Sequence, residues 1–567
     1  MVQWKVIGGG DNGILVREGK DLKSAEAGRL ANDSVLEELE LAGERLKYQL
    51  VSGQGPSTGW ISLKVKGKEL VAKHEAAWGA DFPALDEEVH EVSREDLDLL
   101  GPSTPPEERP YGIIVYGATG FTGMLAVQHL DAVLAAEGGP KLPWAIAGRN
   151  ADKLASVKKL CKTEVAVLVV TGEEQEVHKM VGQCRVVISA IGPFSRLGEP
   201  VIRACVAFGT HYADVSGETW WLKRMIARYD AEARRRGVTL VPMCAQQATI
   251  SDVATSMLVK KLGPLKQVRG YVLQMAFTTG GTDNTGRATM EAVCKNPHLF
   301  KDVVDPFVMG GVRKGGVRDI DKDCSAVEKD TLFPKFWLGP LGCAGTDGRC
   351  VRRSSALFEE ARGKREMQYG EEFSFVLRDV ATGKAAADRL MQMFGPLASA
   401  EAAPGALQAM LQGVMTGQSP PPGEGPPPKS RERFWVTYIM TAEGENGQWA
   451  TCRYNGGDPY EVTSMCVAMG ALTLLEEPEA VNARECGGIV TPAFAFASAG
   501  YVDRLKKHRW ACSEKGASVD WDVKDGQPTQ DEIMKKFTGR TQNFMQFTMA
   551  QRGGEVKQWA LPDYAPS

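Results

Sequence analysis

The sequence lacks the patterns that mark membrane-spanning, secreted and nucleic-acid-binding proteins. No window reaches the roughly 18 consecutive apolar residues of a membrane span, and residues 1–6, MVQWKV, lack the basic segment and apolar core of a secretory signal. Lysine and arginine number 67 against 71 aspartates and glutamates, and no basic run stands out. We therefore expect a cytoplasmic protein with no transmembrane segment and no nucleic-acid partner. Association with a membrane surface or a lipid droplet stays open.

Cysteine pairs with metal-ligand spacing are also missing. The twelve cysteines are scattered without a Cys-x-x-Cys pair, and most lie inside apolar stretches, as Cys184, Cys205 and Cys466 do. This distribution predicts buried thiols in a reducing compartment. Cys343 and Cys350 lie close in sequence, but no histidine or second cysteine pair is near them, so we predict no metal site.

The sequence does contain a glycine turn between a strand pattern and a helix pattern. The turn, GATGFTG at 117–123, follows the apolar run 113–116 and precedes apolar residues at helical spacing through 124–134. The first two glycines allow a sharp turn and close approach to a pyrophosphate, the third allows the helix to pack on the strand, and the helix N-terminus offers N–H donors. With 62 glycines in the chain, an ordinary tight turn is the alternative. The predicted cofactor contacts here are Gly117, Thr119, Gly120, Phe121, Thr122 and Gly123.

The next 130 residues alternate between strand and helix patterns, as a doubly wound parallel sheet requires. We expect further strands at 143–147, 165–170, 185–190, 211–215 and 238–243. The intervening helices are expected at 151–161, 173–183, 199–208 and 219–236. The fold class predicted for this region is α/β, a Rossmann-type parallel sheet.

Two further segments of this sheet predict cofactor contacts. At the end of the second strand an acidic residue would bind the ribose of NAD, whereas a basic one would accept the 2′-phosphate of NADP. Arg149 stands there, and its planar, permanently charged fork favours NADP(H); a solvated loop arginine is the alternative. Small residues follow the fourth strand at the edge where ligands of open α/β sheets bind. They are Ala190, Ile191, Gly192 and Pro193.

The proton donor for a reduction is not evident from the sequence. Tyr212, Asp214, Ser216 and Glu218 lie on or just after the fifth strand and would face the crevice. None stands at the Tyr-x-x-x-Lys spacing of a known dyad, and each residue type is more often structural than catalytic. The catalytic residues stay unassigned.

Several stretches together resemble the saccharopine dehydrogenase-like oxidoreductases, including the trans-acting enoyl reductases. They include GATGFTG, LPWAIAGRNADKL, VVISAIGPFSRLGEPVIRACVAFGTHYADVSGE, TTGGTDNTGRATM, VRRSSALF, PGEGPPPKSRERFW, NGGDPYEVTSM and GGIVTPAFAF, and they span roughly 110–508. The resemblance implies an NADP(H)-dependent oxidoreductase that reduces a small enoyl, carbonyl or imine compound. A lipid or polyketide acyl thioester is favoured, and a homodimer stays open.

One segment departs from that family. Where the family has Cys-Gly-Phe-Asp-Ser and a later proline, this chain has CAQQATISD at 244–252. The change alters the loop above the sixth strand. A catalytically lapsed NADP-binding scaffold that docks on a partner is therefore the alternative function.

The domain organisation predicted from composition and pattern has five parts. Short strands with glycine turns at 1–80 resemble a bacterial-type SH3 barrel, which would bind a protein partner. An acidic, proline-rich linker at 81–110, extended except for a short helix near 94–100, leads to the NADP-binding domain at 111–262. An α+β substrate-side domain at 263–508 and a C-terminal extension at 509–567 follow.

In the substrate-side domain we expect a long strand at 268–277 and then a threonine–glycine turn, 278–282, where an anion or carbonyl would bind. Strands at 434–441 and 448–454 predict an antiparallel sheet, with the last helix returning to the NADP-binding domain. Helices are expected at 288–294, 384–395, 400–416, 461–475 and 492–507. The extension is expected to hold a strand at 519–523 and a helix at 529–538.

Overall fold

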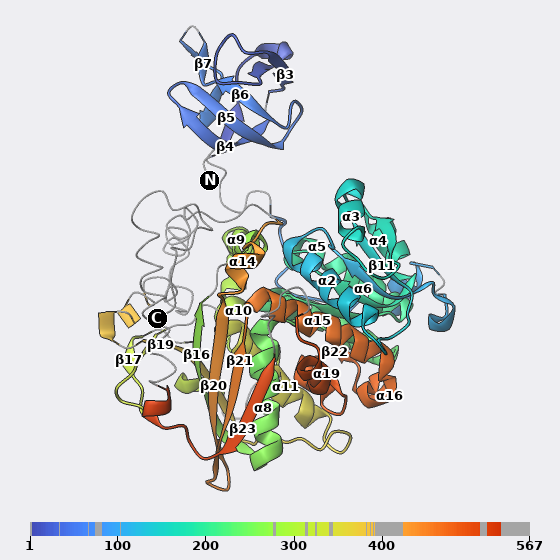
Figure 1. Cartoon of the computed structure of the whole chain (residues 1–567), viewed down its shortest axis with the longest axis vertical. Coiled ribbons are helices and arrows are strands. Elements are labelled where there is room, and N and C mark those ends of the chain that lie inside the picture. The colour runs from blue at the N-terminus through green and yellow to red at the C-terminus, as the bar shows by residue number, and fades with distance from the viewer. Residues whose placement is uncertain are drawn as a thin grey trace. The chain divides into compact units, whose positions relative to one another are not determined.

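A computed structural model of the chain provides the fold (Figure 1). It describes residues 3–32, 34–65, 67–73, 82–101, 104–275, 279–311, 316–323, 326–339, 344–381, 383–385, 387–388, 391, 423–510 and 519–533. The chain up to Ala84 forms one compact unit, and the larger unit begins at Leu85. The helices predicted at 384–395 and 400–416 fall largely or wholly outside the described residues.

The N-terminal unit is a small all-β domain with an antiparallel sheet of order β3-β2-β6-β5-β4-β1-β9. Alternate apolar side chains of these strands fill its core, including Val6, Val16, Leu36 and Tyr48. The segment is built of short strands, as predicted, and the SH3 resemblance stays a prediction. The strands are β1 Gln3–Val6, β2 Ile14–Arg17, β3 Glu26–Leu30, β4 Val35–Ala42, β5 Arg45–Ser52, β6 Thr58–Ser62 and β9 Val71–Lys73.

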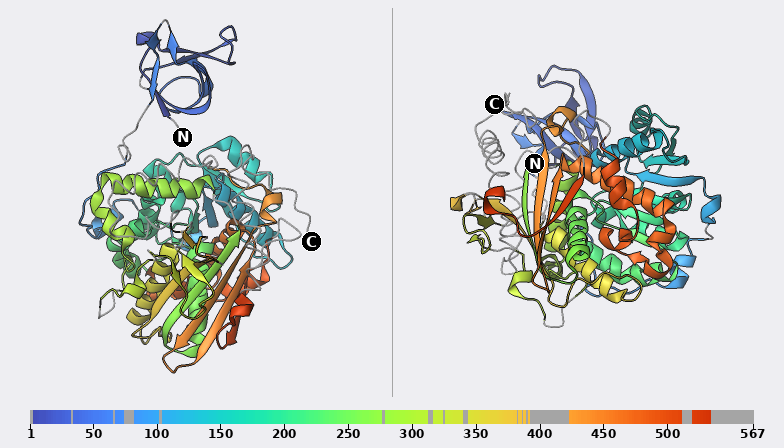
Figure 2. Two further views of the ribbon diagram at one scale, coloured as in Figure 1. Left: turned by 90° about the vertical axis from the view of Figure 1, so that its left-hand side faces the viewer. Right: turned by 60° about the horizontal axis from the view of Figure 1, so that its bottom comes forward.

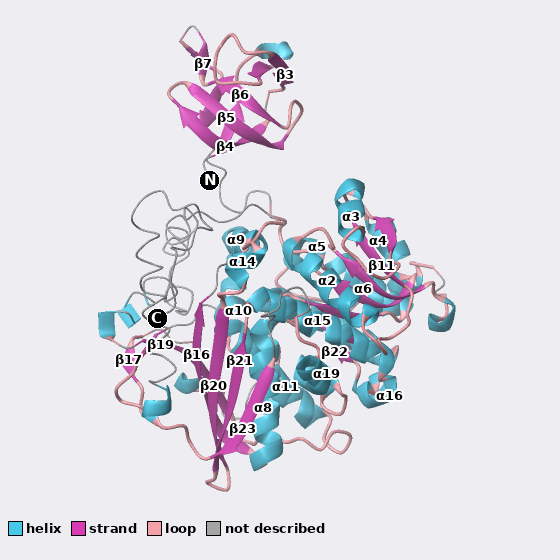
Figure 3. Cartoon of the chain, in the orientation of Figure 1, coloured by secondary structure: helices cyan, strands magenta, loops and turns pink. Residues whose placement is uncertain are grey.

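The larger unit contains a parallel sheet of order β12-β11-β10-β13-β14-β15-β22 (Figure 3). The chain runs outward from β10 to β12, returns to the other side of β10 and continues to β15. The predicted Rossmann-type fold is therefore confirmed, and ligands of such sheets bind where the strand order reverses, between β10 and β13. The strands are β10 Tyr111–Tyr116, β11 Trp144–Gly148, β12 Ala166–Val169, β13 Cys184–Ser189, β14 His211–Asp214, β15 Thr239–Val241 and β22 Gly488–Ile489.

Helices connect these strands close to where the sequence predicts them. They are α2 Phe121–Ala135, α3 Ala151–Lys158, α4 Glu174–Val181, α5 Phe194–Leu197, α6 Glu199–Phe208, α7 Thr219–Arg235 and α8 Gln246–Leu262. Distant segments complete this layer. Helix α15 (Pro459–Glu476) packs on α2, and the Ser464 hydroxyl donates to the Thr122 carbonyl at 3.3 Å. Strand β22 adds a seventh parallel strand beside β15.

The second sheet of this unit is mixed, with order β17-β18-β19-β16-β20-β21-β23. The two strands predicted to pair antiparallel, β20 and β21, do so, whereas β16 and β19 run parallel. Strand β23 lies in the predicted C-terminal extension, yet it pairs with β21 and belongs to this sheet. The strands are β16 Leu265–Met275, β17 Glu328–Lys329, β18 Trp337–Gly339, β19 Ser374–Ala381, β20 Trp435–Gly444, β21 Trp449–Gly456 and β23 Asp520–Asp525.

One continuous core joins the two sheets of the larger unit. Helices α8 and α11 (Ala344–Glu360) lie along one face of the mixed sheet (Figure 2, right), and α8 also contacts α15. Buried side chains of all these elements belong to a single apolar cluster, including Ile188, Leu258, Met440 and Met465. The elements that hold the parallel sheet therefore also hold the mixed sheet beside it.

The predicted helix at 492–507 is two helices, α18 (Pro492–Phe496) and α19 (Tyr501–Lys507). The chain breaks between them because the Glu477 carboxylate accepts the Gly500 N–H at 2.7 Å and the Arg504 guanidinium at 2.9 Å. Among the described residues no helix is long and apolar enough to cross a membrane.

The acidic segment at 85–110 is packed rather than extended, contrary to the prediction. It contains a short helix, α1 (Arg94–Asp98), and its backbone bonds to α7, with Val92 N–H donating to the Arg228 carbonyl at 2.9 Å. The Arg236 guanidinium pairs with Asp98 at 2.8 Å. Such contacts with the rest of the unit hold the segment in place, although its excess of like charges predicts an extended linker.

Candidate functional site

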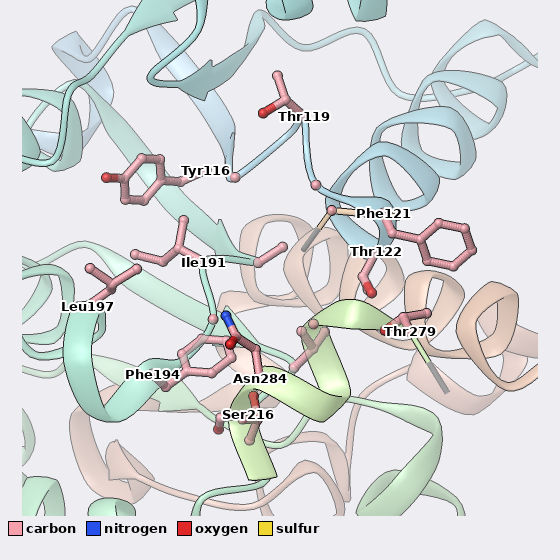
Figure 4. Close-up of a pocket in the computed structure, with 18 of the residues that line it drawn as sticks. Tyr116, Thr119, Phe121, Thr122, Ile191, Phe194, Leu197, Ser216, Thr279 and Asn284 are labelled. Carbon is pink, nitrogen blue, oxygen red and sulfur yellow. The ribbon is translucent and has the colours of Figure 1, made fainter. Parts of the chain in front are cut away.

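A cavity of about 720 Å³ lies along the carboxyl edge of the parallel sheet, at the strand-order reversal (Figure 4). Its lining comes from the loops after β10, β11, β12, β13, β14 and β15. The first turns of α9 (Gly280–Lys295) and α15 complete it. The cavity thus joins the end of the glycine turn to the threonine–glycine turn at 279–282, which are far apart in sequence.

The glycine turn has the backbone that a pyrophosphate cradle needs. Gly117 has φ of +88°, and a Cβ there would lie 2.8 Å from the Ala190 carbonyl oxygen. A Cβ at Gly123 would lie 2.1 Å from the Gly117 carbonyl oxygen, so this glycine lets α2 pack against the turn. At Gly120 the nearest atom would be 3.4 Å away. Gly120 therefore faces open space in the cavity, next to the N-terminus of α2.

Nine of the eleven residues predicted to contact the cofactor line the cavity. The two exceptions are Gly123, which packs beneath the turn, and Pro193, which directly precedes helix α5. The nine are Gly117, Thr119, Gly120, Phe121, Thr122, Arg149, Ala190, Ile191 and Gly192.

Two cations lie at one end of the cavity, beyond β11. Arg149 lines it as predicted, and Lys153 from the first turn of α3 lines it as well. Asn150 caps that helix, its side chain accepting the Lys153 N–H at 2.8 Å. Lys153 was not among the cofactor contacts predicted from the sequence. An Asn cap with a lysine three residues later already places that lysine near the helix N-terminus. This end of the cavity fits a phosphate group attached to the adenosine ribose.

The loop after β13 is held in place by a buried carboxylate. Glu218 accepts the backbone N–H groups of Phe194 at 2.7 Å and Ser195 at 2.9 Å. Burial raises the pKa of Glu218. Glu218 does not line the cavity, so it positions the loop that carries Ile191 and Gly192 and is no proton donor to a ligand.

Of the other three predicted proton donors, two are buried away from the cavity and one lines it. Asp214 accepts the Tyr212 hydroxyl at 2.7 Å, the Ser216 hydroxyl at 2.7 Å and the Met243 N–H at 2.9 Å. Tyr212 and Asp214 are fully buried and do not line the cavity. Burial raises the pKa of Asp214, and its bonds tie the end of β14 to the loop after β15. Of the four candidates, Ser216 alone lines the cavity.

The loop after β15, where the chain departs from the resembled family, carries backbone strain. Met243 has φ of +59° and Ala248 has φ of +70°, a region that side-chain-bearing residues rarely adopt. Three residues that lie between these two positions line the cavity: Ala245, Gln246 and Gln247. The Gln246 amide donates to the Tyr438 hydroxyl at 3.3 Å, which anchors this loop to the mixed sheet.

The opposite wall of the cavity is polar and comes from α9 and α15. The Tyr460 hydroxyl accepts the Thr279 N–H at 3.0 Å and lies 2.7 Å from the Thr282 hydroxyl oxygen. Asn284 also lines this wall, and Figure 4 shows its amide directed toward the loop that carries Ile191. Burial raises the pKa of Tyr460, so its phenol stays protonated at neutral pH. The wall therefore offers hydroxyl donors opposite the loop after β13.

Buried charged side chains and an aromatic ring surround Tyr460 and hold it in position. Asp458 caps α15 by accepting the Tyr460 N–H at 3.0 Å, and Arg431 pairs with Glu461 at 3.0 Å. The Phe121 ring packs edge-on against Tyr460, with ring centroids 5.6 Å apart. The Arg431 guanidinium lies 5.6 Å from the Phe121 ring centroid. This framework links the glycine turn to the polar wall and limits the movement of the Tyr460 side chain.

Comparisons with known proteins agree with this geometry. Residues 113–241 match the family model described as the saccharopine dehydrogenase NADP binding domain. The trans-acting enoyl reductase of Mycobacterium tuberculosis (strain H37Rv) is 28% identical over 413 residues, which cover 70% of this chain and 95% of that protein. The Mycobacterium ulcerans trans-acting enoyl reductase is 28% identical over 422 residues, covering 69% and 95%.

Among solved structures, apo saccharopine dehydrogenase (L-Glu forming) from Saccharomyces cerevisiae aligns with a TM-score of 0.40 and 12% identity. The alignment covers 73% of this chain and 100% of that chain. The sequence comparisons confirm the resemblance predicted from the motifs, and the matched domain supports NADP(H) as the cofactor.

Proposed function

We propose that this chain, which contains a saccharopine dehydrogenase NADP-binding domain and is homologous to trans-acting enoyl reductases, reduces the carbon–carbon double bond of an acyl thioester with NADPH. The oxidoreductase class follows from the homologues. The observation that carries the finer proposal is the single cavity that extends from Arg149 and the glycine turn to the hydroxyl-lined wall around Tyr460.

In this proposal, the turn at 117–122 and the N-terminus of α2 hold the pyrophosphate, and Arg149 with Lys153 binds the 2′-phosphate. The loop at 190–192 supports the nicotinamide end. Bound NADPH would supply a hydride. The residues of the chain then have to hold the thioester against that end, exclude water and provide a proton.

The polar wall suits the charge that such a reduction develops. Hydride addition at the β-carbon of an enoyl thioester moves the π electrons toward the thioester oxygen, and a proton must then reach the α-carbon. Tyr460 is the best-placed hydrogen-bond donor to the thioester oxygen. Its hydroxyl oxygen already accepts the Thr279 N–H, so its own O–H can be directed to Thr282 or to a ligand. We assign Tyr460 to stabilise that oxygen, with Thr282 beside it.

The test is a scan of NADPH oxidation. Enoyl-CoA thioesters of several chain lengths, a ketone and a saccharopine-type imine would be assayed under one condition. Turnover with the enoyl thioesters and a saturated acyl product by mass spectrometry is the expected result. Turnover of the imine alone would assign the amino-acid branch of the family. Tight NADPH binding with no turnover of any class would favour the scaffold function and point to the strained loop at 243–248.

Removing the Arg149 guanidinium should separate the two nicotinamide cofactors. A charge-assisted hydrogen bond contributes roughly 1.5–3 kcal/mol, so Arg149→Ala should weaken NADPH binding by about ten-fold to a few hundred-fold. NADH lacks the 2′-phosphate, and its affinity should change little. Fluorescence titration of both cofactors measures the difference.

Two neighbouring lysines serve as matched comparisons for that experiment. Lys153→Ala should reduce NADPH affinity less than Arg149→Ala, because a lysine offers a point charge rather than a fork. Lys159 lies at the other end of α3, so Lys159→Ala should have no effect. An equal loss for NADPH and NADH in Arg149→Ala would show that the residue supports the fold instead of reading the phosphate.

A further inference from the structure

A second cavity, of about 500 Å³, lies at the far end of helix α8 from the first. Its wall consists of the last turn of α8 and the following loop, the end of α11, the loop at 365–368 and the residues after α18. The helical part of α8 from Thr249 to Leu262 spans about 20 Å at the usual rise of roughly 1.5 Å per residue. The two cavities share no lining residue, so the second is separate from the proposed reduction site.

A buried arginine forms one wall of this second cavity. Arg365 is only 7% exposed, and its guanidinium donates to the Val481 carbonyl at 2.8 Å and the Ser498 hydroxyl at 2.9 Å. Among the residues that the structure describes, none accepts a hydrogen bond from the Nε–H of Arg365. Phe494 lies beneath the guanidinium, with its ring centroid 5.6 Å away. A buried guanidinium with an unused donor is costly unless an acceptor reaches it.

Lys260 lines the same cavity from α8. Its ammonium donates to the Ala497 carbonyl at 2.9 Å, and partial burial lowers the pKa of Lys260. Within the described part of the chain, neither Lys260 nor Arg365 makes an ion pair with a carboxylate. Glu366 also lines the cavity, although no ion pair joins it to either cation among the described residues. The cavity therefore carries two cations whose present partners are neutral oxygens.

The remaining lining contains both polar side chains, those of Glu366, Gln368 and Ser498, and apolar ones. Val259, Phe358 and Met367 contribute side chains, of which Phe358 is 1% exposed and belongs to the core. A cavity with convergent cations and an apolar wall fits an anion that carries a hydrocarbon portion. We infer that this second cavity is a binding site for an amphiphilic anion, with Lys260 and Arg365 holding a phosphate or carboxylate head group and Pro264, Met367 and Ala497 contacting its hydrocarbon portion.

The test uses octyl phosphate and inorganic phosphate as probes on the full chain, with NADPH present to occupy the first cavity and ionic strength held constant with chloride. We expect saturable binding of octyl phosphate by calorimetry, and weaker binding of inorganic phosphate. Lys260→Glu, which reverses one of the two charges, should weaken octyl phosphate binding by about ten-fold or more.

Lys261→Glu is the matched control, because Lys261 is the next residue on α8, pairs with Asp525 and does not line the cavity. It should bind octyl phosphate like the wild type. Arg365→Gln removes the second charge, and thermal denaturation shows whether that variant folds, so Lys260→Glu carries the test if it does not. Absence of saturable binding by the wild type, or equal losses in the Lys260 and Lys261 variants, would overturn the site. NADPH affinity and turnover should be unchanged in Lys260→Glu, so failure here is distinguishable from failure of the proposed reductase function.

Discussion

Gly120→Leu should abolish most NADPH binding while leaving the chain folded. Gly120 has φ of −77°, which leucine adopts without strain, and a Cβ there would have no atom closer than 3.4 Å. The leucine side chain would instead fill the space beside the N-terminus of α2, where the pyrophosphate is proposed to bind. Loss of two charge-assisted hydrogen bonds, each worth roughly 1.5–3 kcal/mol, predicts affinity lower by about a hundred-fold or more.

Fluorescence titration with NADPH, alongside circular dichroism, measures this effect. Gly120→Ala is the graded comparison, and we expect a smaller loss because one methyl group reaches less far into the cavity. Gly286 in α9 also has open space around it but does not line the cavity, so Gly286→Ala should bind NADPH normally. Normal NADPH affinity in a folded Gly120→Leu protein would refute the cradle.

Tyr460→Phe should lower kcat by about a hundred-fold with an enoyl thioester, while the KM for NADPH changes little. The substitution removes the hydroxyl that we assign to the developing negative charge, and a single such donor is typically worth roughly 10²–10³ in kcat. The ring contact with Phe121 is retained, so the wall should keep its shape. Steady-state kinetics with each substrate varied separately give kcat and KM.

Tyr229→Phe is the matched control for loss of a buried phenol. The Tyr229 hydroxyl bonds to Glu199 at 2.8 Å and does not line the cavity, so kcat should be preserved. Thr282→Val should reduce kcat less than Tyr460→Phe, because the Tyr460 hydroxyl and the Thr279 N–H remain in place. A Tyr460→Phe enzyme with wild-type kcat would mean that another group stabilises the thioester oxygen, with Ser216 the next residue to test.

The parallel sheet could be predicted because its signals are local. Strands buried on both faces are continuous apolar runs, each followed by an amphipathic helix, and the glycine turn specifies both a backbone conformation and a ligand. Arg149 could be identified for the same reason, since its position directly after β11 determines where it lies at the sheet edge. Motif spacing alone thus predicted most of the residues that line the cavity around the glycine turn.

The other half depends on segments that meet only after folding. Tyr460 and Thr282 are separated by 178 positions, and no periodicity in either segment reveals the contact. The first turns of helix α11 contain two glycines, a threonine and an aspartate, which are residue types that local propensity does not favour in a helix. It is helical because Val351, Leu357 and Phe358 are buried against α8, β19 and α18.

Burial also decided which polar residues are available to a ligand. The sequence placed Tyr212, Asp214, Ser216 and Glu218 near one sheet edge, and the structure turns three of them into internal supports. Lys260 and Arg365 are ordinary surface-type residues in the sequence, yet folding brings both of them to the second cavity. The sequence by itself therefore determined the sheet, its glycine turn and the cofactor class, because these follow from short-range spacing. The tertiary structure alone decided which side chains face each cavity, because that depends on long-range packing.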